Sequence, residues 1–213
     1  MNKLKKTIQE NGGFQHWFVN VFWYHYRWPL LIAVAIVGIV GFITVDSLRK
    51  ERYDTTVVIA TDYYVDDTQL QTLDDVLSPV VEDVDGNGQV NIRYVVLFVG
   101  DTELGRQNQE RMYLYMTEED VACYLMSSSI SDAYTTPQLE YFLDEVEQYG
   151  LPADPDNSVR VSLVGNPVLA ECGMEDMYFS IMDHTTDTGV AAARHARDMA
   201  IAMANALVEA GEE

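Results

Sequence analysis

TVVIAT (Thr56–Thr61), IRYVVLFV (Ile92–Val99) and VACYLM (Val121–Met126) are three short runs in which most residues are apolar. A continuous apolar run of about four to eight residues has the length of a buried strand. Strands that are apolar on both faces are typical of parallel sheets with helices on either side. The three runs therefore predict the centre of an open α/β sheet.

The segments that connect these runs carry helical patterns. Apolar residues recur with helical spacing over 67–80, 104–116 and 189–208. A further helix is predicted over 137–149, because it begins with proline in its first turn and ends at a glycine. The chain therefore alternates between strands and helices, as expected for right-handed crossover connections.

Two more strands follow in the C-terminal part of the chain. Apolar and polar residues alternate over 159–163, which predicts a half-exposed edge strand, and 177–182 predicts a fifth strand. The predicted fold class is α/β, with an open, mostly parallel five-stranded sheet and helices on both faces, preceded by one transmembrane helix.

The segment Pro29–Val45, PLLIAVAIVGIVGFITV, contains no charged residue. At about 1.5 Å per residue it is roughly 25 Å long, at the short end of what a bilayer requires. All three tryptophans of the chain, at positions 17, 23 and 28, lie just before it, as in an interfacial aromatic belt. A cleavable signal peptide is the alternative, but no small-x-small cleavage site follows the apolar run. We predict an uncleaved transmembrane anchor at 29–45.

The flanks of this anchor predict its orientation. Residues 1–28 read as a cytoplasmic basic tail with an interfacial aromatic amphipathic segment, or alternatively as a disordered tail that wets the membrane. Four basic residues precede the anchor and three follow it, and a short basic N-terminus before a first span usually stays inside. We therefore expect a single-pass protein of the cell membrane with a cytoplasmic N-terminus. A short linker at 46–54 would lead to an acidic extracytoplasmic α/β domain at 55–213.

Charge is distributed very unevenly along the chain. Residues 1–50 have a net charge of +4, whereas residues 51–213 carry seven arginines and 32 acids, a net charge of −25. An acidic body of this kind repels phosphate backbones, so nucleic acid is excluded as a partner. The lipid bilayer is the partner that the N-terminal segment predicts.

The first candidate site is the rim at the carboxyl ends of the predicted strands, where open α/β sheets bind ligands. Hydroxyls, aromatic faces and backbone N–H groups can together hold a small polar ligand there. The alternative is that these residues only turn the chain and cap helices. The predicted ligand-binding residues are Asp62, Tyr63, Tyr64, Ser127, Ser128 and Ser129, with Gly100 and Asp101 nearby.

The second candidate is the segment DVDGNGQV at 83–90, which resembles the first part of a calcium loop. Its metal ligands would be Asp83, Asp85, Asn87 and Gln89. Position 12 of such a loop falls on Tyr94, so the bidentate carboxylate is missing. We expect the segment to act chiefly as a glycine-rich turn, with calcium binding weak if it occurs, and we expect no other cofactor.

Enzyme signatures are largely missing from the sequence, so no catalytic residues and no enzymatic activity are predicted. No nucleophile elbow, zinc-protease motif or dinucleotide fingerprint occurs, and no lysine follows Lys50 to complete a P-loop. His184 lies in a cluster that helix capping explains, and His195 reads as a surface residue of a helix. Cys123 lies within an apolar strand, and no base stands near Cys172 in the sequence to activate its thiol.

The order of three motifs resembles a known group of proteins. YHYRWP at Tyr24–Pro29, the strand end Asp62-Tyr63-Tyr64 and the loop at 83–90 resemble uncharacterised single-pass membrane proteins of Gram-positive gut bacteria. Their outer domain is similar to one lobe of type 2 periplasmic (extracytoplasmic) solute-binding proteins, which close two lobes on a ligand. The resemblance implies a membrane-anchored extracytoplasmic binding module whose ligand is unknown. The alternative is a non-enzymatic cell-envelope scaffold or assembly protein that binds a partner protein through the same lobe.

Overall fold

The computed structural model describes residues 23–49, 53–84, 86–135, 142–184 and 191–211. The chain divides into two compact units, Met1–Glu51 and Arg52–Glu213. In the first unit, helix α3 spans Tyr24–Arg49 and contains the whole predicted segment 29–45. Among the described residues, no helix is both long and apolar enough to cross a membrane, so the predicted span is not confirmed.

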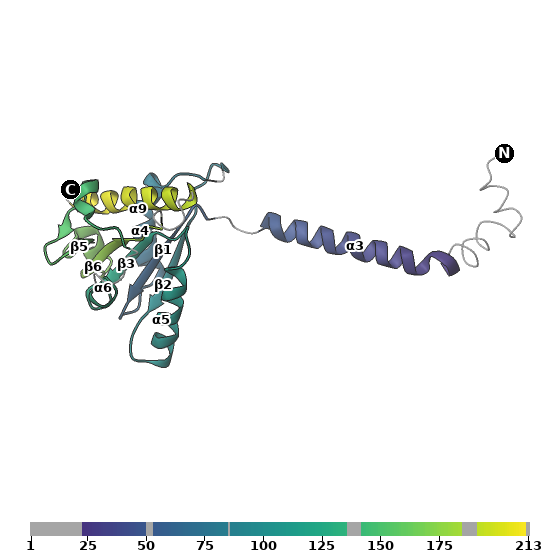
Figure 1. Cartoon of the computed structure of the whole chain (residues 1–213), viewed down its shortest axis with the longest axis horizontal. Coiled ribbons are helices and arrows are strands. Elements are labelled where there is room, and N and C mark those ends of the chain that lie inside the picture. Colours follow the sequence, from purple (N-terminus) through teal and green to yellow (C-terminus); the bar gives the residue numbers. More distant parts are fainter. Residues whose placement is uncertain (1–22, 50–52, 85, 136–141, 185–190, 212–213) are drawn as a thin grey trace, which may run out of the picture. The chain divides into compact units, whose positions relative to one another are not determined.

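The second unit is built on one open sheet of six strands in the order β2-β1-β3-β6-β5-β4 (Figure 1). The strands are β1 (Thr55–Thr61), β2 (Ile92–Phe98), β3 (Cys123–Ser127), β4 (Ala153–Asp154), β5 (Asn157–Ser162) and β6 (Met177–Ile181). The three apolar runs of the sequence form β1, β2 and β3 at one side of this sheet, and β1 pairs in parallel with both of the others. The predicted α/β class and open sheet are confirmed.

The prediction of five mostly parallel strands is wrong. The sheet has six strands, and the pairs β3–β6, β6–β5 and β5–β4 are all antiparallel. The connection between β4 and β5 explains part of this difference, because only residues 155 and 156 separate them. So short a link permits an antiparallel hairpin, whereas a parallel crossover needs about a dozen residues.

Helices cover both faces of the sheet, as predicted. The longer ones are α4 (Asp67–Leu77), α5 (Glu103–Tyr115) and α9 (Ala191–Ala210), and the short ones are α6 (Ser128–Tyr134) and α7 (Pro167–Glu171). Two 3-10 turns, η2 (Ser78–Val80) and η3 (Val146–Tyr149), complete the described elements. The predicted helix over 137–149 is wrong in its described part, since Phe142 forms a bridge with Met182 and only Val146–Tyr149 is helical, as a 3-10 turn. Its residues 137–141 lie outside the described residues.

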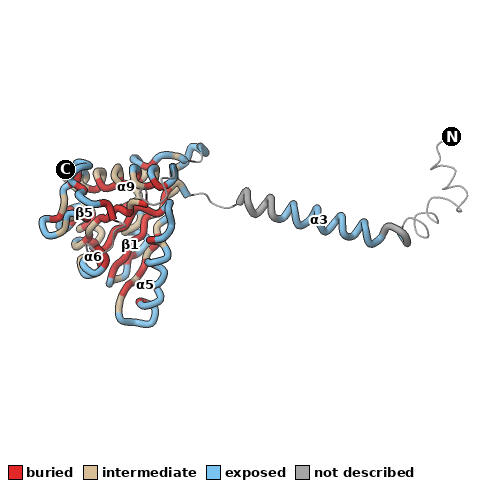
Figure 2. The backbone as a smooth tube through the Cα atoms, in the orientation of Figure 1, coloured by how far each residue is buried: buried red, intermediate tan, exposed pale blue. Residues whose placement is uncertain are grey.

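Each face of the sheet has its own apolar core. Leu73 and Leu77 of α4 and Met203 of α9 pack on the face that carries Val57 and Ile59. The opposite face carries Val58, Ala60 and Tyr124, and there the buried residues of α5 and α6, such as Met112 and Ile130, close the core. Because alternate residues of a strand point to opposite faces, a strand between two helical layers must be apolar throughout. The central strands are accordingly buried along their length (Figure 2).

The predicted half-exposed edge strand at 159–163 is also a wrong assignment. β5 lies between β6 and β4 and is not an edge. Val159, Val161 and Leu163 are exposed by 9%, 0% and 3% respectively, and Arg160 between them is buried as well. The alternation of apolar and polar residues therefore reflects the buried ion pair of Arg160 with Asp154, and not a solvent-facing side.

Candidate functional site

The carboxyl ends of β1 and β3 bring part of the predicted rim together. These strands are adjacent and parallel, so Asp62 and the serines that follow β3 leave the sheet at the same edge. The Ser129 hydroxyl donates a hydrogen bond to Asp62 Oδ2 at 3.0 Å, and the hydroxyl oxygens of Ser127 and Ser129 are 3.5 Å apart. Asp62, Ser127 and Ser129 thus form one polar cluster, in which Ser127 is fully buried and the other two are exposed.

Tyr63 ties the rim to the start of β6 through an internal contact. Its hydroxyl lies 3.3 Å from Asp176 Oδ1 and 3.0 Å from Met177 Sδ, so it ties the end of β1 to the start of β6. Burial raises the pKa of Tyr63, and the negative charge of Asp176 raises it further. The phenol therefore stays protonated and is already used in an internal contact.

Tyr64, in contrast, projects into solvent with 84% of its surface exposed. It borders an open hollow of about 460 Å³ beside the start of α4. The hollow is lined by Tyr64, Asp66, Thr68, Gln69, Thr72, Glu171 and Cys172. An aromatic face next to hydroxyl, amide and carboxylate groups can bind a small polar molecule.

Local interactions hold the wall of this hollow in place. Asp66 caps α4, with its Oδ1 accepting from the N–H groups of Thr68 at 2.9 Å and Gln69 at 3.0 Å. Gln69 Oε1 accepts a hydrogen bond from the Asp66 N–H, which completes a capping box. Gln69 Nε2 donates to the carbonyl oxygen of Cys172. The last contact connects α4 with the end of α7, which lies 103 residues later in the chain.

The remaining rim residues serve the backbone. The N–H of Ser128 donates to the carbonyl oxygen of Asp176 at 3.0 Å, and Ser128 is half-buried. At the end of β2, Asn108 Nδ2 of α5 donates to the carbonyl oxygen of Phe98 at 2.9 Å, and Gly100 lies against Gly105. The structure thus does not bring Gly100 and Asp101 into the polar cluster of Asp62.

Sequence reasoning missed Glu171 and Cys172 at the hollow. The Asp66–Gln69 spacing is a recognisable capping signal that could have located one wall. Glu171 ends α7, a helix of five residues, Cys172 follows it, and no local pattern relates the two residues to α4. Their place in the site depends on the tertiary fold alone.

The loop at 83–90 forms a turn whose carboxylate oxygens face its own backbone. Asp83 accepts hydrogen bonds from the N–H groups of Gly86 at 2.8 Å, Asn87 at 3.2 Å and Gly88 at 2.7 Å. The Asn87 side-chain oxygen accepts from the N–H of Gln89 at 2.7 Å. Gly86 and Gly88 have positive φ values of 69° and 83°, which residues with a Cβ atom rarely adopt. Asp85 lies outside the described residues.

A residue outside the motif completes this turn. Asp54, just before β1, accepts from the N–H of Val84 at 2.8 Å and from the N–H of Asn91 at 2.8 Å. The carboxylates of Asp54 and Asp83 therefore accept the backbone hydrogen bonds that organise the described part of the loop. Among the residues that the structure describes, no group of three or more His, Cys, Asp or Glu side chains is placed to hold a metal ion.

Weak calcium binding at this loop stays a prediction. We expect calorimetric titration of the full chain with calcium to give a Kd in the millimolar range or no heat at all, because Tyr94 stands where such a loop needs its bidentate carboxylate. A micromolar Kd that disappears in Asp83→Ala would contradict this expectation. Asp156→Ala, which changes another surface acid, is the control.

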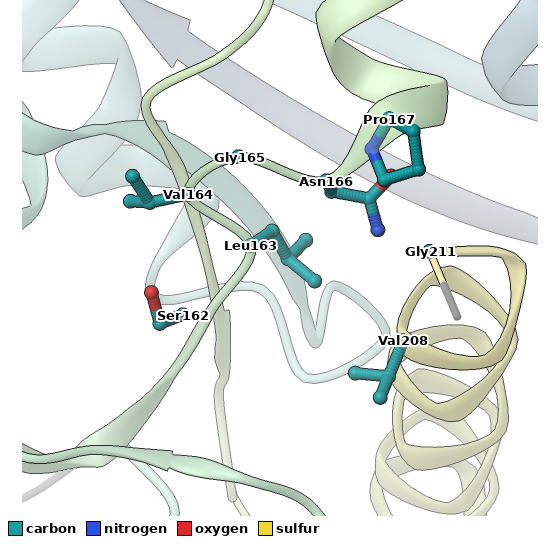
Figure 3. A pocket seen from close by; sticks show the side chains of 8 residues that line it. All are labelled: Ser162, Leu163, Val164, Gly165, Asn166, Pro167, Val208 and Gly211. Carbon is teal, nitrogen blue, oxygen red and sulfur yellow. The ribbon is translucent and has the colours of Figure 1, made fainter.

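A second hollow, of about 200 Å³, lies where the loop after β5 meets the end of α9 (Figure 3). Its most polar side chain is Asn166, which Figure 3 shows directed toward Gly211. Asn166 Oδ1 caps α7 by accepting from the N–H groups of Val168 and Leu169, and its Nδ2 donates to the carbonyl oxygen of Leu207 at 2.7 Å. The amide is used on both sides, so this hollow is a helix junction.

Arg160 is the buried charge that sequence reasoning missed. Its guanidinium donates to Asp154 and Asp132 at 2.6 Å each and to the Ser131 hydroxyl at 3.0 Å. It also lies 3.9 Å from the centre of the Tyr178 ring. Burial acts to lower the pKa of Arg160, but hydrogen bonds and charges from the two aspartates outweigh it and raise the pKa overall. The cluster joins β4, β5, β6 and α6.

Two histidines, His184 and His195, and both cysteines have described side chains. His195 Nδ1 is 3.9 Å from Glu82 Oε2 on the surface, and His184 is buried. The thiol of Cys123 is fully buried beside Met203 Sδ at 3.7 Å, and burial raises its pKa to about 12. The thiol of Cys172 donates to the carbonyl oxygen of Val168 at 3.1 Å.

No protein-family model, curated protein or solved structure matches this chain. The resemblance drawn from the sequence motifs therefore stays an expectation.

Proposed function

We propose that the chain is a membrane-anchored extracytoplasmic binding module that holds a small polar ligand at the carboxyl ends of its parallel strands. The observation that carries this proposal is the exposed ring of Tyr64 beside the hollow of about 460 Å³. A large aromatic side chain that is 84% exposed gains nothing from the fold itself. A ligand that stacks on this ring would reach the polar lining of the hollow.

The lining favours a neutral or cationic ligand. Asp66 and Glu171 contribute carboxylates, Thr68 and Thr72 contribute hydroxyls, and no lysine or arginine is among the lining residues. The net charge of −25 over residues 51–213 adds a long-range field that repels anions. A solute with hydroxyl or ammonium groups fits this chemistry best.

A non-enzymatic role agrees with the state of the Cys123 thiol at the start of β3 and of the hydroxyls at the rim. A thiol with a pKa of about 12, such as that of Cys123, is not ionised at neutral pH and is no nucleophile. The Tyr63 phenol, with its raised pKa, is no general base either. The polar cluster of Asp62, Ser127 and Ser129 serves for hydrogen bonding.

The anchor part of the proposal rests on the first unit of the chain. α3 carries the uncharged segment 29–45, and its described large apolar side chains, among them Trp28 and Phe42, are 39–74% exposed. Such a surface needs an apolar environment, which a bilayer would supply. Protease added to intact cells should remove the acidic domain. A protected domain, or a mature N-terminus near residue 46, would contradict the anchor.

The surface around Tyr64 also suits the alternative function, an envelope scaffold that docks a partner protein there, because exposed tyrosines often anchor interfaces. An exposed apolar patch over 159–163 would have favoured the scaffold. The burial of Val159, Val161 and Leu163 removes that support. The small-ligand proposal is therefore the stronger one.

The test measures binding by the full chain in detergent micelles to three probe classes: neutral sugars, amino acids and polyamines. We expect one class to raise the Tm, and we expect Tyr64→Ala to weaken its binding about tenfold, as loss of a stacking contact of about 1.4 kcal/mol would. Because Tyr64 is exposed, the Tm without ligand should hardly change.

One control variant and one further site variant make this experiment decisive. Tyr149→Ala removes another exposed tyrosine that does not line the hollow, and it should leave binding unchanged. Glu171→Gln should weaken binding of polyamines far more than binding of sugars. If no probe binds, or if Tyr64→Ala binds as well as the unmodified chain, the proposed site is wrong.

A further inference from the structure

The two edges of the sheet differ in how well they are protected. β4 has two residues and a register shift, and its Asp154 side chain turns inward to Arg160. Short length, irregular register and an inward charge are the features by which natural proteins block an edge. β2 has seven residues that pair in unbroken register with β1, and it contains no proline, glycine or lysine. Among the described residues, its outer side has no partner strand.

The side chains of β2 would pair well with those of a second β2. In an antiparallel pair centred on Val95, Tyr94 would lie opposite Val96 of the second copy, and Ile92 opposite Phe98. Residues 92, 94, 96 and 98 are all half-buried on their own sheet, so each leaves apolar surface for a neighbour. Mixed aromatic and aliphatic pairs are favourable across strands, and this register places no like charges opposite each other.

Charge distinguishes this edge from the rest of the domain. Residues 92–116, which form β2 and α5, contain three arginines and three acids, a net charge of zero. Residues 52–213 as a whole contain seven arginines and 31 acids, a net charge of −24. Two copies of this acidic chain would therefore repel each other least at β2, whereas a basic partner would be drawn to other surfaces.

Helix α5 extends the same edge with apolar side chains. Tyr113, which is 54% exposed, contacts Tyr134 of α6 on one flank of α5, whereas Tyr115 contacts Arg93 of β2 on the other flank. Leu104 lies 11 residues before Tyr115, close to three helical turns, and so shares its flank. It is 58% exposed, and its helix packs on β2 (Figure 1).

We propose that the chain forms a two-fold symmetric dimer in which β2 pairs antiparallel with β2 of a second copy around Val95. The pairing joins two six-stranded sheets into one and satisfies the outward N–H and C=O groups of both edges. The proposal does not depend on the ligand site at Tyr64.

The test is a cysteine crosslink at the two-fold axis, made in the full chain with Cys172→Ser and purified in detergent micelles. In Val95→Cys the introduced thiol would lie opposite the same thiol of the second copy, so mild oxidation should give a disulfide-linked dimer. Arg93→Cys is the matched control: it lies on the same strand and face but would face Leu97 of the second copy, so it should not crosslink.

A second measurement covers the case in which Val95→Cys fails to fold. Light scattering of the chain with its natural cysteines should show a dimer whose Kd decreases when salt is added, because salt screens the repulsion of two acidic bodies. Val96→Lys, which changes a half-buried residue of β2, should raise the Kd about tenfold, since the lysine would have to lie against Tyr94 of the second copy. A monomer at all concentrations, a crosslink in Arg93→Cys but not in Val95→Cys, or an unchanged Kd in Val96→Lys would overturn the proposal.

Discussion

Arg160→Met is expected to lower the free energy of unfolding of the acidic domain by about 3–5 kcal/mol, the range seen when one partner of a buried ion pair is removed. Asp154 is 8% exposed and would keep a charge with no compensating cation. The fully buried Ser131 hydroxyl would lose the hydrogen bond that it now accepts from the Arg160 guanidinium. The variant also loses the contact with the ring of Tyr178.

The measurement needs a probe located in the domain. All three tryptophans precede residue 29, so tryptophan fluorescence does not follow its unfolding. Near-ultraviolet circular dichroism of the tyrosines during urea unfolding is suitable, as is hydrogen exchange of the β5 and β6 amides.

Arg106→Met is the matched control for Arg160→Met. Arg106 pairs with Glu103 at 2.9 Å, but the two side chains are 62% and 76% exposed. Such surface pairs contribute about 0–1 kcal/mol. A second check is Arg160→Met combined with Asp154→Leu, which removes both buried charges and should recover much of the lost stability. Equal small losses for Arg160→Met and Arg106→Met would show that the buried cluster contributes nothing special.

The second large effect is expected for Gly105→Ala, with a loss of about 3 kcal/mol, the upper end of the range for overpacking. A Cβ at position 105 would lie 2.2 Å from the carbonyl oxygen of Gly100 and 2.6 Å from its nitrogen. Both atoms belong to the backbone, so no side-chain rotation relieves the contact. α5 would have to move away from the end of β2.

Helix propensity acts in the opposite direction, which makes the experiment informative. Alanine is more favourable than glycine within a helix by about 1 kcal/mol, so an increase in stability would be expected if packing played no part. Gly100→Ala is the matched control, because its Cβ would meet only the Phe98 ring at 3.5 Å, an ordinary contact. Both variants can be followed by the same urea unfolding. An unchanged or higher stability of Gly105→Ala would contradict the predicted clash.

The central part of the fold could be predicted from sequence because its signal is local. A strand covered by helices on both faces has to be mostly apolar, and the runs at 56–61, 92–99 and 121–126 show this directly. The start of α4 could be placed for a similar reason, since the Asp66 cap and Gln69 are three residues apart. The turn at 83–90 also depends on neighbouring residues, Asp83 with the glycines that follow it.

The C-terminal half was predicted less well, because the same patterns have two physical causes there. A polar residue between two valines indicates a solvent-facing side only if no partner meets it inside the protein. Arg160 meets Asp154 from the neighbouring hairpin and Asp132 from α6, so the alternation marks a buried pair. Proline at 137 and glycine at 150 are equally compatible with a helix and with the bridge and 3-10 turn that the structure has between 142 and 149.

By itself the sequence determined the apolar strands, the helical connections on both faces and the separation of a charge-free segment at 29–45 from an acidic body. These properties follow from the periodicity and composition of adjacent residues, which burial imposes along each element. Only the tertiary structure decided the strand order, the antiparallel half of the sheet, the inward turn of Tyr63 and the approach of Glu171 to Tyr64. Each of these features depends on contacts between residues up to about a hundred positions apart. Such contacts stabilise the fold but produce no periodicity or motif in the local sequence.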